Sequence, residues 1–124
     1  MSIPNYNQIV RTTGGVEVKR TKIDAASNAA AGNTLVASVA GKRLCILGVT
    51  LIAAGTVSTT FYSGPGDSGT ALSGALPLAA NGGFVVNPPA DPAMHWLETV
   101  AGQALTLKLS AAIQCSGFIT YYEA

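Results

Sequence analysis

One short run of this sequence is apolar on both alternating sets of positions, and it constrains the fold more than any other feature. Within residues 44–52 the apolar side chains are Leu44, Cys45, Ile46, Leu47, Val49, Leu51 and Ile52. Successive side chains of a strand point to opposite faces of its sheet, so this pattern predicts a strand that is covered on both faces. The run is short, rich in β-branched residues and bracketed by Gly41 and Gly55, which disfavours a helix. We therefore expect one face to join a core and the other to meet a loop, an arm or another subunit.

Other strand-like segments precede and follow this run, separated by clusters of Gly, Pro, Asn and Ser. They are residues 16–23, 33–39, 56–62, 70–73 with 76–78, 83–86, 94–99, 105–109 and 115–122. The first of them is polar and is expected at a sheet edge. Turns at roughly eight- to twelve-residue spacing, with no amphipathic helix, indicate an all-β protein. The prediction is an antiparallel β-sandwich of about eight short strands with jelly-roll or Greek-key connections.

The chain has 124 residues, which suits one domain. Residues 1–15 are predicted to form a flexible N-terminal arm, because Pro, Asn and a Gly pair interrupt any regular pattern there. Tyr6, Ile9 and Val10 give this arm a few anchors. Ordering on a partner and simple fraying both remain open for it. Residues 16–124 are predicted to form a single β-sandwich domain.

Charge is sparse and unevenly distributed. Charged residues make up only 10% of the chain, and such a bland surface favours self-association or docking. Of the seven Lys and Arg residues, all but Lys108 fall in the first third: Arg11, Lys19, Arg20, Lys22, Lys42 and Arg43. These cations are interpreted either as ordinary solvated strand edges or as a basic end that docks on an acidic protein surface. No dense basic stripe interleaved with aromatic residues is present, which disfavours nucleic acid.

The two cysteines, Cys45 and Cys115, each lie in a strand-like run. This position is typical of buried thiols that stay reduced in a cytoplasm, with a disulfide between neighbouring strands as the alternative. No signal-peptide pattern opens the sequence, and no apolar run reaches the length of a membrane span.

The sequence offers no convincing set of catalytic residues. Residues 66–69, Gly-Asp-Ser-Gly, match the nucleophile segment of trypsin-like proteases, but the histidine of those enzymes precedes the serine. Here the only histidine, His95, follows Ser68, so we interpret the segment as a turn. No Cys, Asp or Glu lies near His95 at the ligand spacing of a structural zinc site. Asp91 and Glu98 could flank it, but a single histidine beside Trp96 is more often packed or hydrogen-bonded. No close pair of carboxylates occurs, and no glycine run fits a phosphate loop. We expect no catalytic residue, no metal, no cofactor and no enzymatic activity.

Aromatic residues give a further alternative. Phe61, Trp96, Tyr121 and Tyr122 could form a platform on which a sugar stacks. Packing in the core or between subunits explains these side chains better, because aromatic residues are only 6% of the chain.

Three segments resemble small virion proteins of tailed phages and prophages. The shared pattern covers about residues 33–122. It comprises a basic pair at 42–43 before the central strand, Leu-Pro-Leu at 76–78 running into Asn-Gly-Gly at 81–83, and Trp-Leu-Glu-Thr at 96–99 before the last two strands. The residues before Gly15 depart from the pattern. These motifs describe a fold and carry no chemistry.

The resemblance implies a jelly-roll virion structural protein, most familiar as a capsid decoration (cement) protein that binds as a dimer or trimer. On this hypothesis the chain is made in the cytoplasm of a bacterial host and binds the outer surface of the major capsid protein lattice. Its expected partners are the major capsid protein and itself, with neither nucleic acid nor membrane. The candidate partner-binding residues are Tyr6, Ile9, Val10, Arg11, Lys19, Arg20, Lys22, Lys42 and Arg43. The alternative is a binding module of a tail fibre, spike or baseplate, which would use loops 64–69 and 87–91 against a receptor or carbohydrate.

Overall fold

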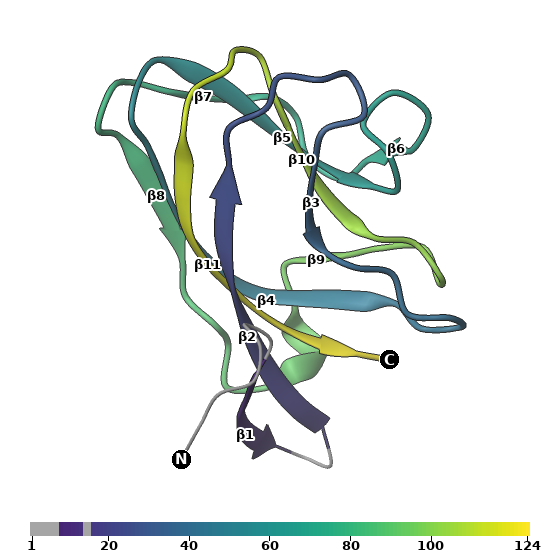
Figure 1. The fold of residues 1–124 in the computed structure, drawn as a ribbon. Coiled ribbons are helices and arrows are strands. Elements are labelled where there is room, and N and C mark those ends of the chain that lie inside the picture. The colour runs from purple at the N-terminus through teal and green to yellow at the C-terminus, as the bar shows by residue number, and fades with distance from the viewer. Residues whose placement is uncertain (1–7, 14–15) are drawn as a thin grey trace.

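Two antiparallel sheets pack into a sandwich in the computed structural model, which describes residues 8–13 and 16–124 (Figure 1). The elements of these ranges are β1 (Gln8–Thr13), β2 (Val16–Ala25), β3 (Asn33–Val36), β4 (Leu44–Ala53), β5 (Val57–Ser63), β6 (Thr70–Ala71), β7 (Leu76–Leu78), β8 (Gly83–Val86), the 3₁₀ helix η1 (Pro92–Met94), β9 (Leu97–Glu98), β10 (Leu105–Leu109) and β11 (Cys115–Glu123). The predicted all-β sandwich is confirmed.

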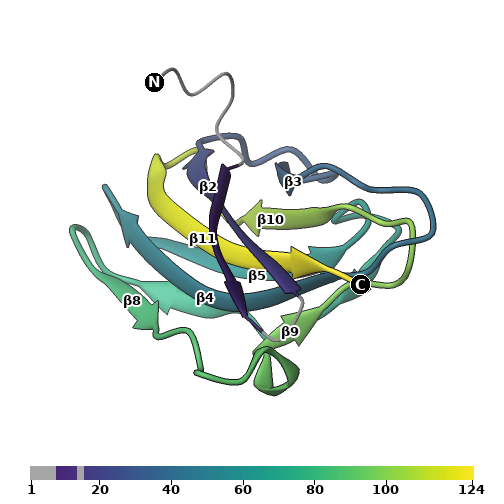
Figure 2. The same ribbon diagram turned by 90° about the horizontal axis from the view of Figure 1, so that it is seen from below.

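The strand order is that of a jelly roll. The six-stranded sheet has the order β1-β2-β11-β4-β8, with β9 also paired to β4, and the five-stranded sheet has the order β3-β10-β5-β6, with β7 also paired to β5. Strands β2, β3, β4 and β5 alternate between the sheets, and so do β9, β10 and β11. The last strand, β11 (yellow), therefore runs between β2 and β4 in the middle of its sheet (Figure 2).

The central strand β4 contributes to the core between the sheets over its whole length. Leu44 and Ile46 point inward near its start, and Val49 and Leu51 point inward further on, which requires one change of alternation. The change coincides with a register shift against β11, where consecutive residues of β11 pair with Gly48 and then Ile46. An irregularity of this kind re-aims the side chains that follow it.

The outer face of β4 is covered as well in the first half of the strand. Cys45 and Leu47 lie on the face of the six-stranded sheet that points away from the five-stranded sheet, and they are 2% and 0% exposed. They form a small apolar cluster with Val18 of β2 and Tyr122 of β11, and Val16 packs against it. Cover on both faces is thus confirmed for the first half of β4, and neighbouring strands of the same sheet provide much of it. Near the end of the strand the outer face is open, and Ile52 is 54% exposed.

Aromatic rings fill the middle of the core. Phe61 of β5 is fully buried, and its ring meets those of Trp96 and Phe84 edge to face at centroid distances of 5.4 and 6.5 Å. Tyr121 is also fully buried in this core. These rings fix the two sheets against each other through contacts that aromatic pairs favour.

Two local expectations differ from the structure. Strand β1 lies within the segment predicted as an arm, and it pairs antiparallel with β2, with a register shift between Ile9 and Arg11. The prediction that β2 lies at an edge is therefore wrong for Val16–Arg20, because β1 pairs with the backbone groups on that side. The ladder with β1 does not reach residues 21–25. The strand expected over residues 94–99 is shortened to β9, since Pro92 starts η1 and the side chain of Asp91 accepts a hydrogen bond from Ala93 N.

Candidate functional site

The candidate cations whose side chains the structure describes do not form one surface. Tyr6 lies outside the described residues, and Ile9, Val10 and Arg11 lie on β1. The remaining five cations occupy three separate places. Lys19 and Lys42 lie where the first residues of β2 approach the last residues of β11. Arg20 and Lys22 lie on the outer face of β2, and Arg43 lies just before β4.

Lys19 and Lys42 lie near Glu123. Lys19 Nζ donates to Glu123 Oε2 over 2.9 Å, and this hydrogen bond raises the pKa of Lys19 above its usual value. Lys42 is exposed and lines a shallow hollow together with Val16, Glu17, Lys19 and Glu123. Acidic side chains therefore offset part of the positive charge at this end of the molecule.

Arg20 and Lys22 lie on the outer face of the six-stranded sheet, because they alternate with the buried Thr21 and Ile23. The Arg20 guanidinium carbon is 5.2 Å from the centre of the Phe118 ring, within the range of a cation–π contact. Lys22 Nζ is 3.9 Å from a carboxylate oxygen of Asp24.

Exposed apolar side chains adjoin these two cations. Lys22, Phe118, Thr50 and Val85 are successive cross-strand partners on β2, β11, β4 and β8, so they form one row across the sheet. Ile52 follows Thr50 on the same face of β4. Phe118, Ile52 and Val85 are 42%, 54% and 62% exposed, respectively. We name Arg20, Lys22, Ile52, Val85 and Phe118 the outer-face patch.

Arg43 belongs to a different group of polar side chains at the start of β4. Arg43 Nη1 and His95 Nε2 lie 3.9 and 3.8 Å from the same carboxylate oxygen of Glu98. On the other side of the imidazole ring, Nδ1 is 3.2 Å from the Tyr122 hydroxyl and 3.3 Å from the Pro92 carbonyl oxygen. We name Cys45, His95, Glu98 and Tyr122 the His95 cluster.

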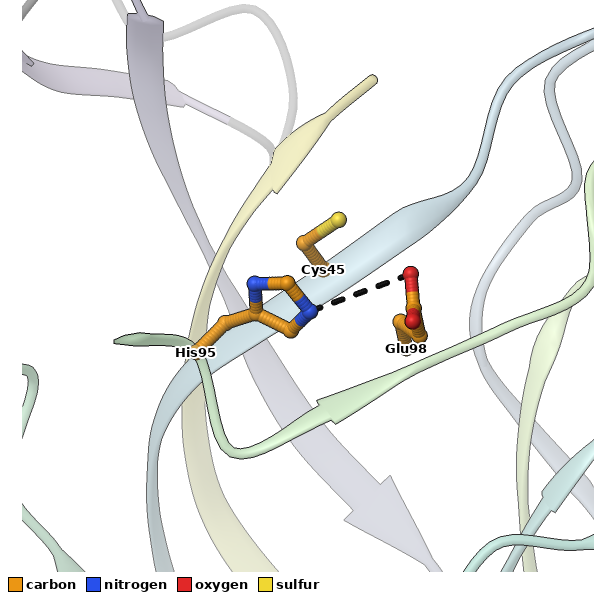
Figure 3. Close-up of side chains that lie close together, drawn as sticks. All are labelled: Cys45, His95 and Glu98. Carbon is orange, nitrogen blue, oxygen red and sulfur yellow. Dashed lines mark ion pairs between the residues drawn. The ribbon is translucent and has the colours of Figure 1, made fainter. Parts of the chain in front are cut away.

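Three separate parts of the chain build the His95 cluster. Cys45 rises from β4, and His95 and Glu98 come from β9 and the residues just before it (Figure 3). Tyr122 comes from β11. Pairing of Cys45 with Glu98 in the β4–β9 ladder, and with Tyr122 in the β4–β11 ladder, places both partners beside the thiol. The sequence spacing around His95 does not reveal Cys45, because only strand pairing brings the two together.

Burial raises the pKa values of two groups in this cluster, the Cys45 thiol and the Tyr122 hydroxyl. It raises the pKa of the Cys45 thiol above its usual value, although a hydrogen bond with Tyr122 acts in the opposite direction. Burial and the hydrogen bond with Cys45 raise the pKa of Tyr122 to about 12. Both groups therefore carry their protons near neutral pH.

The Gly-Asp-Ser-Gly segment forms a loop in which Asp67 and Ser68 are exposed. Gly66 N donates to the Ala31 carbonyl, and Lys108 Nζ donates to the Gly66 carbonyl over 3.4 Å. The polar contacts of the His95 ring are with Pro92, Glu98 and Tyr122, so Ser68 has no histidine beside it to accept its proton.

The four aromatic residues considered for a sugar platform do not gather on the surface. Phe61 and Tyr121 are fully buried, Tyr122 is 8% exposed, and Trp96 packs against Phe61. Packing accounts for these side chains.

Both cysteines are free and buried. Cys45 pairs with Tyr122 and Cys115 pairs with Ala53, so the thiols lie at opposite ends of the β4–β11 ladder. The alternative of a disulfide between them is excluded by this placement.

Within residues 8–13 and 16–124, no helix has the length and apolar character needed to cross a bilayer. Comparisons with protein-family models, with curated proteins and with solved structures give no match.

Proposed function

We propose that this chain is a virion structural protein, a capsid decoration protein that binds the outer surface of the major capsid protein lattice and stabilises the head. The observation that carries the proposal is the outer-face patch, which combines three exposed apolar side chains with Arg20 and Lys22. The resemblance of residues 33–122 to small phage virion proteins gives the class of partner.

The composition of the patch defines the surface that would cover it. Burying Ile52, Val85 and Phe118 against apolar atoms gives a favourable free energy of roughly 25 cal/mol per Å². Arg20 and Lys22 at one side of these residues fit a partner surface that is acidic beside its apolar centre. The fit of a protein lattice is better than that of nucleic acid, because the apolar side chains would have no partner on a phosphate backbone.

A lattice also compensates for the small size of the patch. Once one contact of an oligomer has formed, each further contact is effectively intramolecular, so weak contacts add up to firm attachment. This reasoning requires a dimer or trimer of the chain on the capsid, which is part of the proposal.

The test is co-sedimentation with expanded capsids that lack decoration protein, prepared from the virus that encodes the chain. Wild-type protein is expected to bind at saturable sites. Phe118→Ser and Arg20→Glu are each expected to weaken binding at least about tenfold, and the effect of Arg20→Glu should shrink at high salt. Val100→Ser and Lys108→Glu are matched controls, because Val100 is 48% exposed outside the patch and Lys108 lies beside Tyr62 of the other sheet.

Failure of the wild-type protein to bind such capsids contradicts the proposal. Equal binding by wild type, Phe118→Ser and Arg20→Glu contradicts the assignment of the patch. The copy number per virion, measured by quantitative proteomics, is a second criterion: a decoration protein is present in hundreds of copies, whereas a tail module is present in few.

The alternative, a binding module of a fibre, spike or baseplate, would use loops 64–69 and 87–91. A shallow cavity of about 380 Å³ adjoins the first loop and is lined by small and polar residues, among them Gly64, Pro65 and Gln103. Its lining includes no aromatic side chain on which a sugar could stack, so we rank this alternative second.

A further inference from the structure

The His95 cluster contains three different kinds of metal ligand that converge on one point. The Cys45 sulfur, a ring nitrogen of His95 and a carboxylate oxygen of Glu98 all lie within 4.8 Å of one another (Figure 3). We propose that these three residues bind one divalent transition-metal ion, with Zn²⁺ as the preferred ion and water as its fourth ligand.

The chemistry of the donors favours zinc among common divalent ions. A thiolate, a neutral imidazole and a carboxylate are the ligands that Zn²⁺ takes, whereas Mg²⁺ and Ca²⁺ prefer oxygen alone. Metal–ligand bonds of about 2.0–2.3 Å in a tetrahedron put ligand atoms roughly 3.3–3.8 Å apart. The separation between His95 Nε2 and Glu98 Oε2 is already 3.8 Å. A contraction of about 1 Å in the widest separation completes the geometry, and the Cys45 proton passes to solvent when the metal binds.

Hydrogen bonds already orient the imidazole for this task. Nδ1 lies next to the Pro92 carbonyl and the Tyr122 hydroxyl, so the tautomer with its proton on Nδ1 satisfies the local acceptors. The lone pair of Nε2 then points toward Glu98. In this arrangement the Tyr122 hydroxyl accepts from His95 and can donate to the Cys45 sulfur, which is the second layer of hydrogen bonds that metal sites use.

Arg43 does not prevent metal binding. Arg43 Nη1 lies 3.9 Å from Glu98 Oε2, the same oxygen that His95 approaches. Once that oxygen is bound to the ion, Arg43 can pair with the other carboxylate oxygen of Glu98. The bound ion would link the segment between η1 and β9 to strand β4. It would therefore stabilise the folded state by binding it in preference to the unfolded chain.

The test uses the full chain with any affinity tag removed, since a polyhistidine tag would supply competing ligands. After removal of metal with a chelator, the protein is titrated with Co²⁺ and then with Zn²⁺. We expect a thiolate-to-cobalt absorption band that saturates at one equivalent and is abolished by Zn²⁺. We also expect Zn²⁺ to raise the melting temperature by about 5 °C or more at a concentration of roughly 100 Kd.

Variants separate this site from adventitious binding. Cys45→Ser should abolish the cobalt band, whereas Cys115→Ser, which changes the other buried thiol, should keep it. His95→Gln and Glu98→Gln should each weaken Co²⁺ binding at least about tenfold, and so should the loss of the Tyr122 hydroxyl in Tyr122→Phe. Circular dichroism checks that each variant folds. If Cys45→Ser does not fold, His95→Gln tests the site in its place, because His95 is partly exposed.

Absence of a thiolate band in the wild-type protein overturns the proposal, and so does an unchanged band in Cys45→Ser or unchanged affinity in His95→Gln. The measurement involves no capsid, so its failure leaves the proposed decoration role unaffected, and a failure of capsid binding leaves the metal site unaffected.

Discussion

Lys19 forms a close ion pair with Glu123. Its Nζ lies 2.9 Å from Glu123 Oε2, whereas the pairs of Lys22 with Asp24 and of Arg43 with Glu98 have 3.9 Å between their atoms. Only about a quarter of each side chain of the closer pair is exposed. Partial shelter from water makes such a pair more effective than a fully solvated one.

We expect Lys19→Met to lower the free energy of unfolding by about 0.5–1 kcal/mol at neutral pH. The hydrogen bond with Glu123 raises the pKa of Lys19 above 10.5 in the folded state, so its contribution is complete below that pH. The contribution declines as the pH rises through the higher, folded-state pKa, because the folded protein then also loses the proton. Wild type and variant should therefore converge in stability above pH 10.5, as measured by urea unfolding across a pH series.

Lys42→Met is the matched control, because Lys42 is exposed beside the same hollow and forms no ion pair with the described residues. It should change stability by less than about 0.5 kcal/mol at every pH. A pH-independent difference between wild type and Lys19→Met would show that lost packing of the long side chain, rather than charge, accounts for the effect.

At the level of elements, the loop between β8 and β9 crosses close to β4 at Gly48. A Cβ atom at this position would lie 2.8 Å from both Pro88 Cγ and the Val86 carbonyl oxygen. No real side chain tolerates such distances without movement of the loop. The same loop carries His95, so its position against β4 also determines the geometry of the His95 cluster.

Gly48→Ala is accordingly expected to destabilise the protein by about 1–3 kcal/mol, the usual cost of overpacking. It should also weaken Co²⁺ binding relative to wild type, because the loop must move away from Cys45. Gly74→Ala is the control, since a Cβ atom there meets nothing within 4 Å. Equal urea midpoints for the two variants would contradict the close approach of the loop.

Sequence patterns predicted the strands well where side chains alternate clearly. The cleanest alternation, Leu105–Leu109, is β10, and the doubly apolar run is β4, whose first half is covered on both faces. Strand β1 was missed because its partner, not its own sequence, holds it in the sheet. Alternation also could not reveal the register shift in β4, which decides the faces of Leu47 and Val49.

The candidate sites depend more strongly on pairing between distant strands. Phe118 and Val85 become neighbours of one surface only through the register of β11, β4 and β8. Cys45 and His95 meet for the same reason. Of the predicted binding residues, Arg20 and Lys22 belong to the outer-face patch, and Arg43 adjoins the His95 cluster. The five cations whose side chains the structure describes form no single surface.

On the scale of the whole molecule, both sheets are built largely by pairing strands that lie far apart in sequence. β11 pairs with both β2 and β4, and β10 pairs with β3 and β5. Loops must close before such contacts can form, so we expect refolding in about milliseconds to seconds rather than microseconds. Stopped-flow fluorescence of Trp96, the only tryptophan, measures this rate, because its ring packs against Phe61 in the core. A microsecond phase that carries the full amplitude would contradict the prediction.

The central position of β11 also affects how a cell makes this protein. Neither β2 nor β4 has its full set of partners until residues 115–123 have left the ribosomal exit tunnel. Up to that moment the nascent polypeptide carries a gap in the middle of its larger sheet, with one edge of β2 and one edge of β4 left unpaired. The native sandwich can therefore form only after residues 115–123 have been made, and until then the growing chain exposes strand edges and apolar surface that favour aggregation.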